Sequence, residues 1–118
     1  MSSQTARVNM IKQQLRTGDV LDETILNLYH TVPREDFVPK KFEDFAYSDM
    51  QIALPHDQRM MSPLEEAQLL QALALTGNET VLEVGTGTGF FTALLSHLSK
   101  KVISVDCIED FTQNARQN

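Results

Sequence analysis

The feature that most constrains the fold of this chain is an apolar run followed by three glycines on alternate positions. Thr80–Val84 is short and rich in aliphatic residues, which predicts a strand. Gly85, Gly87 and Gly89 come directly after it, and glycine allows sharp turns and close approach of the backbone to a ligand. Residues 90–98 then show the apolar spacing of a helix. This order predicts an α/β fold with a nucleotide site at the carboxyl end of the strand.

The spacing of the glycines separates two classes of nucleotide ligand. A dinucleotide fingerprint, G-x-G-x-x-G, would need glycine where Phe90 stands, which argues against a nicotinamide cofactor. The segment instead reads E-x-G-x-G-x-G from Glu83 to Gly89, the form that goes with S-adenosylmethionine. Val102–Asp106 reads as the next parallel strand, and an acid about 20 residues beyond such glycines accepts hydrogen bonds from ribose hydroxyls. The predicted cofactor-binding residues are Glu83, Gly85, Thr86, Gly87, Gly89 and Asp106. A glycine-rich loop that binds nothing is the alternative.

Composition excludes several other classes of protein. With 118 residues, 42% apolar residues and a net charge of −6, the sequence predicts a soluble chain of at most one domain. The acidic balance argues against a nucleic-acid partner. No apolar stretch approaches membrane-spanning length, and the polar N-terminus resembles no secretory signal. The single cysteine, Cys107, allows no internal disulfide and suits a cytoplasmic protein; we interpret it as a packed thiol rather than a nucleophile.

The N-terminal half predicts two helices and then a less regular segment. Residues 4–17 have an amphipathic pattern that Gly18 is expected to end. Asp22 can cap a second helix, which should stop before Pro33. Residues 32–61 are rich in proline and aromatic side chains, and their pattern assigns no secondary structure.

A strong helix start separates this half from the glycine motif. Ser62 to Glu65 reads S-x-x-E with proline at the first helical position, which predicts a capping box. The helix is expected to end at Gly77-Asn78, and a further helix is expected over residues 109–117. We therefore divide the chain into a helical and loop-rich segment, 1–62, and the first part of an α/β domain, 63–118.

Several motifs together resemble the protein-L-isoaspartate O-methyltransferases. They are Gln14-Leu15 before the first glycine, the block V-P-R-E-x-F-V-P at Val32–Pro39, Ala46-Tyr47, Gln58 and the glycine motif. The proline-flanked block is the most specific of these, and the resemblance runs through nearly the whole chain. It implies a truncated Rossmann-like fold of the S-adenosylmethionine-dependent methyltransferases with an N-terminal extension. The implied reaction is methylation of isoaspartyl carboxylates in damaged proteins, whose esters collapse to succinimides and reopen partly to aspartate.

The implied chemistry needs no catalytic base. A carboxyl group with a pKa of about 4 is already ionised at neutral pH, so catalysis would come from aligning its oxygen with the sulfonium methyl group. Under the resemblance, Glu83 and Asp106 would hold the amino end and the ribose of the cofactor. The histidines lack the spacing of metal ligands, and no metal site is predicted. These histidines are His30, His56 and His97.

Two departures from the family pattern leave alternatives open. Members usually read G-x-G-Q-T-I-S-Q-P before the capped helix, whereas Arg59 stands at the threonine and Met61 at the active-site serine. Ser62 is one position late and is better explained as the helix cap. No catalytic residue is therefore assigned. Either this is a divergent member with a reshaped pocket, or isoaspartyl recognition is lost or altered.

The second departure is length. Two parallel strands with unpaired edges do not make a stable sheet. We therefore expect the chain to be the N-terminal part of a longer enzyme, inactive alone and prone to form a homodimer or a swapped oligomer. Three hypotheses remain: a methyltransferase that acts on isoaspartyl-containing proteins, a non-catalytic cofactor-binding or interaction module of that family, and a dinucleotide-binding protein.

Overall fold

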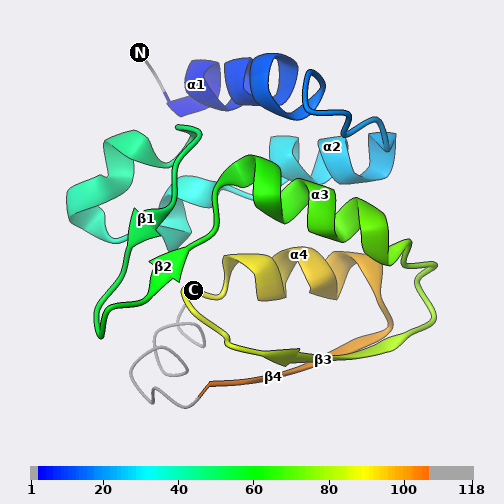
Figure 1. The fold of residues 1–118 in the computed structure, drawn as a ribbon. Helices are drawn as coiled ribbons and strands as arrows, with labels where there is room; N and C mark the ends of the chain where they lie inside the picture. Colours follow the sequence, from blue (N-terminus) through cyan, green and yellow to red (C-terminus); the bar gives the residue numbers. More distant parts are fainter. Residues whose placement is uncertain (1–2, 107–118) are drawn as a thin grey trace.

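The computed structural model describes residues 3–106, so the predictions for Cys107 and for a helix over 109–117 fall outside it. Within these residues, four α-helices lie above a two-stranded sheet, and a short hairpin lies at one side of them (Figure 1). In chain order the elements are α1 Ser3–Met10, η1 Ile11–Leu15, α2 Glu23–Thr31, η2 Arg34–Phe37, η3 Lys40–Phe45, β1 Ile52–Ala53, β2 Arg59–Met60, α3 Pro63–Leu73, β3 Thr80–Val84, α4 Phe90–Leu98 and β4 Lys101–Val105.

The predicted strand–helix–strand unit is present. β3 and β4 pair in parallel, with Thr80 opposite Lys101 and Val84 opposite Val105. The Gly85 N–H donates to the Val105 carbonyl at 2.7 Å and extends the pairing into the glycine turn. Helix α4 lies between α3 and the sheet (Figure 1). The α/β fold class is confirmed, and β4 begins one residue earlier than the pattern predicted.

Both predicted helix caps are confirmed. The Asp22 carboxylate accepts hydrogen bonds from the N–H groups of Thr24 and Ile25, at 2.9 and 3.3 Å. At the start of α3, the Ser62 hydroxyl accepts from the Glu65 N–H at 3.3 Å, and the Glu65 carboxylate accepts from the Ser62 N–H at 3.1 Å. These local side-chain bonds satisfy N–H groups that a helix start leaves without partners.

Two predicted helix ends are wrong. Helix α3 stops at Leu73 rather than at Gly77-Asn78, because Ala74 takes a left-handed conformation with φ 49°. In the first helix the left-handed residue is Asp19, with φ 66°, and not Gly18. Glycine at 18 leaves room for Leu64, because a Cβ there would lie 2.4 Å from Leu64 Cδ1 and 3.0 Å from the Gln14 carbonyl, and the Leu64 side chain would have to shift. Gly18 therefore allows the N-terminal helix to pack closely against α3.

The segment that the sequence left unassigned forms two 3₁₀ helices, η2 and η3, and the hairpin β1–β2. In the hairpin, Ile52 pairs with Met60 and Ala53 pairs with Arg59. His56 and Asp57 at its tip have φ of 62° and 57°. Two consecutive positive φ values are the geometry of a type I′ turn, which matches the twist of a hairpin.

One apolar cluster joins the N-terminal helices to the α/β unit. Buried side chains of η1, α2, α3 and α4 pack in it together. Side chains from both sides of residue 62 share this core. The division of the chain into two segments at that residue stays a prediction. The most buried members of the core include Met10, Ile11, Leu15, Leu26, Tyr29, Ile52, Leu70, Phe90 and Leu94.

The face of the sheet away from α4 carries exposed apolar side chains. Leu82 and Val84 of β3 are 64% and 80% exposed, and Ile103 and Val105 of β4 are each 46% exposed. The register places Leu82 opposite Ile103 and Val84 opposite Val105, so the four side chains form one patch. Parallel sheets are normally covered on both faces. In the part of the chain that the structure describes, no helix covers this patch (Figure 1).

Candidate functional site

The glycine turn between β3 and α4 has the backbone geometry that only glycine adopts readily. Gly85, Gly87 and Gly89 have φ of 100°, 56° and 90°. A Cβ built at Gly85 or Gly87 would meet no atom within 4 Å, so space lies open beside both residues. Gly89 is the first residue before α4, and the turn is closed by a bond from its N–H to the Thr86 carbonyl at 3.0 Å. The turn therefore exposes backbone to a ligand in front of a helix N-terminus.

Glu83 lies at the centre of a hydroxyl network on the helix-facing side of the sheet. Its Oε1 accepts hydrogen bonds from the Thr92 hydroxyl on α4 and from the Ser104 hydroxyl on β4, the latter at 2.6 Å. Ser104 Oγ also lies 2.6 Å from the hydroxyl of the buried Thr86. Three elements thus fix the direction of the Glu83 carboxylate. Thr86, which the sequence assigned to the cofactor, has its side chain in this supporting network.

Asp106 holds the glycine turn. Its Oδ2 accepts a hydrogen bond from the Gly87 N–H at 3.0 Å. The carboxylate at the end of β4 and the turn after β3 are therefore joined across the carboxyl edge of the sheet. This bond brings together the two acids and the glycines that the sequence singled out.

A cavity of about 200 Å³ opens between the glycine turn and the β1–β2 hairpin. Glu83, Gly85, Thr86 and Gly87 line it, whereas Gly89 and Asp106 are not among its lining residues. Met61, at the position of the family serine, lines it too, while Ser62 is buried and serves as the cap of α3. The other lining residues are Leu54, Arg59, Met60, Glu66, Thr88, Phe90 and Phe91.

A buried ion pair supports the floor of this cavity. Arg34 Nε and Nη2 donate to the two oxygens of the Glu66 carboxylate, each at 3.3 Å, and both side chains are almost fully buried. The same guanidinium donates to the Ala46 carbonyl at 2.6 Å and to the Met61 carbonyl at 2.7 Å, and it lies over the Phe90 ring at 5.3 Å. Arg34 thereby fixes the backbone at Met61 against the start of α4.

Burial raises the pKa of Glu66 to about 7, while the Arg34 guanidinium and the Tyr29 hydroxyl oppose that rise. The Tyr29 hydroxyl lies 3.4 Å from Glu66 Oε1, and burial raises the pKa of Tyr29 well above its usual value. A carboxyl group with a pKa near neutrality beside a binding cavity gives the site a group that titrates in the physiological range.

The sequence reasoning missed this pair. In the sequence, Arg34 stands out only as a member of the proline-flanked block, and Glu66 belongs to no motif. A signal was present, because Glu66 lies one turn before Leu70 and beside Ala67, on the apolar stripe of its helix. A carboxylate on such a stripe requires a buried partner, since isolated buried charges are rare.

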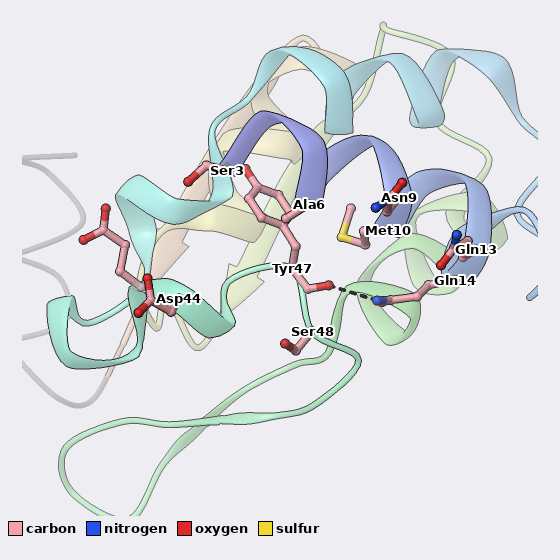
Figure 2. A pocket seen from close by; sticks show the side chains of 10 residues that line it. Ser3, Ala6, Asn9, Met10, Gln13, Gln14, Asp44, Tyr47 and Ser48 are labelled. Carbon is pink, nitrogen blue, oxygen red and sulfur yellow. Dashed lines mark hydrogen bonds between the residues drawn. The ribbon is translucent and has the colours of Figure 1, made fainter. Parts of the chain in front are cut away.

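A second cavity, of about 560 Å³, shares no lining residue with the first. It lies between the N-terminal helix and the segment around Tyr47 (Figure 2). The Gln14 amide donates to the Tyr47 carbonyl at 2.9 Å, whereas Gln14 Oε1 is buried and accepts no hydrogen bond from a described residue. Tyr47 itself is held by Arg7 and Glu35, which form an ion pair at 2.8 Å. These contacts explain why the resemblance includes Gln14, Glu35 and Tyr47: they join the first helix to the irregular segment.

Other kinds of site receive no support from residues 3–106. These residues contain no group of three or more histidine, cysteine, aspartate or glutamate side chains that could hold a metal ion. None of the helices that they form has the length and hydropathy needed to cross a membrane.

Comparison with known proteins connects this geometry to one family. Residues 5–118 match the family model described as protein-L-isoaspartate(D-aspartate) O-methyltransferase. The chain is 36% identical over 112 residues to a protein-L-isoaspartate O-methyltransferase of Methanoculleus marisnigri, covering 95% of the chain. It spans 51% of that relative, about half its length.

Two solved structures share the fold. A protein-L-isoaspartate O-methyltransferase of Plasmodium falciparum, in complex with S-adenosyl-L-homocysteine, superimposes with a TM-score of 0.75 at 17% identity. That match covers 99% of this chain and 54% of the other. A second structure of a protein-L-isoaspartate O-methyltransferase has a TM-score of 0.74 at 23% identity and covers 94% of this chain and 37% of the other.

Proposed function

Because the chain belongs to the protein-L-isoaspartate(D-aspartate) O-methyltransferase family, we propose that the protein methylates carboxylates of isoaspartyl residues in damaged proteins. The observation that carries this proposal is the joined site at the carboxyl edge of the sheet. There the Glu83 carboxylate is held by hydroxyls of two other elements, and the glycine turn is held by Asp106. The cavity of about 200 Å³ lies directly beside Glu83 and the turn.

The residues present fit S-adenosylmethionine. Open space beside Gly85 and Gly87 allows a flat or bulky group to approach the backbone, where any side chain would intrude. The Glu83 carboxylate lines the cavity and would accept from the amino group of the cofactor, and Asp106 would accept from its ribose hydroxyls. Glu83 and Asp106 would thus contact the cofactor directly, and Thr86 and Gly89 would support the turn.

When bound, the cofactor supplies a methyl group on a sulfonium: the acceptor's carboxylate oxygen forms the new C–O bond as the C–S bond breaks, and the electron pair stays on sulfur. The acceptor is already ionised at neutral pH, so no residue of this chain needs to remove a proton. What the residues must do is orient the acceptor and exclude water, and effective alignment of this kind lowers barriers by several kcal/mol, about 7–11 in the best cases. The apolar walls formed by Leu54, Phe90 and Phe91 favour the exclusion of water.

One observation favours a second candidate function, a binding module without methyltransferase activity. Met61 occupies the position of the family's active-site serine and lines the cavity, and Ser62 beside it is buried as a helix cap. Neither residue offers a hydroxyl to an acceptor. A protein of this kind would bind the cofactor and leave isoaspartyl peptides unmethylated.

The test compares the 118-residue chain with the product of its complete reading frame. Binding of S-adenosyl-L-homocysteine is measured by calorimetry, and transfer of labelled methyl to an isoaspartyl peptide is measured beside it. We expect transfer by the product of the complete reading frame. Cofactor binding without transfer by either protein would favour the binding module, and absence of both would contradict the proposal.

Two further proposals concern the protein's setting. A cytoplasmic location is consistent with a sequence that contains a single cysteine. Self-association of the 118-residue chain, as a homodimer or a swapped oligomer, is supported by the exposed patch of Leu82, Val84, Ile103 and Val105. Sedimentation tests the second: a monodisperse monomer would contradict it.

A further inference from the structure

Arg59 lines the cavity beside the glycine turn with a positive charge that pairs with no residue of the described range 3–106. It lies on β2, opposite Ala53, and lines the cavity together with Glu83 and Gly85. Its guanidinium makes no hydrogen bond or ion pair with any residue of the described range 3–106. The side chain is exposed, so water rather than protein solvates the charge. Arginine in such a position is available to an anionic ligand.

The backbone that carries Arg59 is held in place on its C-terminal side. Met60 is buried, and its sulfur accepts from the Thr88 hydroxyl of the glycine turn at 4.0 Å. The Met61 carbonyl accepts from the buried guanidinium of Arg34 at 2.7 Å. On the other strand, the pairing of Ala53 with Arg59 fixes the register. The base of the Arg59 side chain is therefore positioned relative to the glycine turn, and only its outer part has rotamer freedom.

Among the charged side chains of described residues that line the cavity, Arg59 is the one that can bind an anion. Two carboxylates line the cavity, and each has partners already: Glu66 pairs with Arg34, and Glu83 accepts two hydroxyl hydrogen bonds. Arg59 is the one lysine or arginine among the lining residues of the described chain. A guanidinium matches a carboxylate with two parallel N–H donors, and such bonds are about twice as strong as neutral ones.

We propose that Arg59 binds the carboxylate of the methyl acceptor, in the role for which Met61 offers no hydroxyl. This inference rests on the proposed function and adds the residue that recognises the acceptor's ionised carboxylate. A carboxylate has about four lone-pair positions. Two can accept from Arg59, so an oxygen lone pair remains free to face the methyl group. Arg59 is then a specificity-determining residue. Its guanidinium would replace the contact that the family's serine hydroxyl, absent at Met61, would make with the acceptor.

The experiment measures peptide binding to the product of the complete reading frame, saturated with S-adenosyl-L-homocysteine. Calorimetry gives the dissociation constant for an isoaspartyl peptide and for the same peptide with that carboxylate converted to an amide. Three variants are compared with the wild type: Arg59→Gln, Arg59→Lys and, as a matched control, Arg16→Gln. Arg16 is an exposed arginine that pairs with Glu23 at 3.6 Å and does not line the cavity.

We expect wild type to bind the carboxylate peptide at least tenfold more tightly than the amide, as for a charge-assisted pair. Arg59→Gln should remove that preference, Arg59→Lys should keep part of it, and Arg16→Gln should keep all of it. The melting temperature should stay unchanged in all three, and each variant is measured at saturation with S-adenosyl-L-homocysteine. A preference that survives Arg59→Gln, or no preference in wild type, overturns the inference. A preference that depends on Arg59 in a protein that transfers no methyl group would uphold it and refute the proposed function.

Discussion

Removal of the Glu66 carboxylate should destabilise the fold severely, and the structure gives the size of the effect. In Glu66→Ala, the Arg34 guanidinium keeps its bonds to the carbonyls of Ala46 and Met61 but loses both bonds to the carboxylate. Arg34 has no exposed surface, so its charge would be left without a counter-charge and without water. Loss of one partner of a buried ion pair costs about 3–5 kcal/mol. That is a large part of the 5–15 kcal/mol by which folded domains are typically stable.

Urea unfolding of the purified chain, followed by circular dichroism, measures the loss as a lower midpoint. The matched control is Glu65→Ala, the preceding residue on α3, which is exposed, takes part in the capping box and also accepts from the Gln51 amide. Loss of the cap should cost about 1 kcal/mol. A second control, Arg34→Met with Glu66→Leu, removes both charges and should restore part of the stability, because the carbonyls of Ala46 and Met61 still lose their donor. If Glu66→Ala cost no more than Glu65→Ala, the pair would not anchor the cavity floor and the reasoning would be refuted.

Two further predictions concern the pH dependence of stability and a helix end. The folded-state pKa of Glu66, about 7, lies above its ordinary value of 4.5, so its contribution to stability should be fully present below pH 4.5 and lost as pH rises through 7. Urea midpoints between pH 4.5 and 8 should show this fall in wild type and a flatter profile in Glu66→Gln. Ala74→Gly should stabilise the chain by about 1 kcal/mol, because exposed Ala74 has φ 49° and glycine is unstrained there; a lower melting temperature would contradict this.

The sequence predicted those parts of the fold whose causes are local. The caps at Asp22 and Ser62 follow from side chains two or three residues away from the N–H groups that they accept. The glycine turn follows from backbone geometry that other residues resist, and the strands before and after it are short β-branched runs. Each of these signals lies within a few residues of the structure that it produces.

Features that depend on distant partners were not predicted. The role of Gly18 is set by Leu64, which lies far along the chain, so the pattern suggested a helix stop instead. Arg34 and Glu66 come from separate elements and meet only in the folded core. The same holds for Ser104, whose hydroxyl orients Glu83, and for Arg59, whose nearness to the glycine turn depends on the hairpin and on Met60. Helix α3 ends at Leu73 because Ala74 is left-handed, although the helix propensity of the residues after Leu73 favoured a longer helix.

The central claim is that Asp106 and the glycine turn hold S-adenosylmethionine, and calorimetry with S-adenosyl-L-homocysteine tests it most directly. In Asp106→Ala the ribose hydroxyls lose their acceptor and the Gly87 N–H loses its bond of 3.0 Å, so affinity should fall by about 1–3 kcal/mol. Asp106→Asn keeps one acceptor oxygen and should lose less, while the control Asp44→Ala, in the other cavity, should lose nothing. Affinity in Asp106→Ala equal to that of wild type, in a variant that remains folded, would contradict the account.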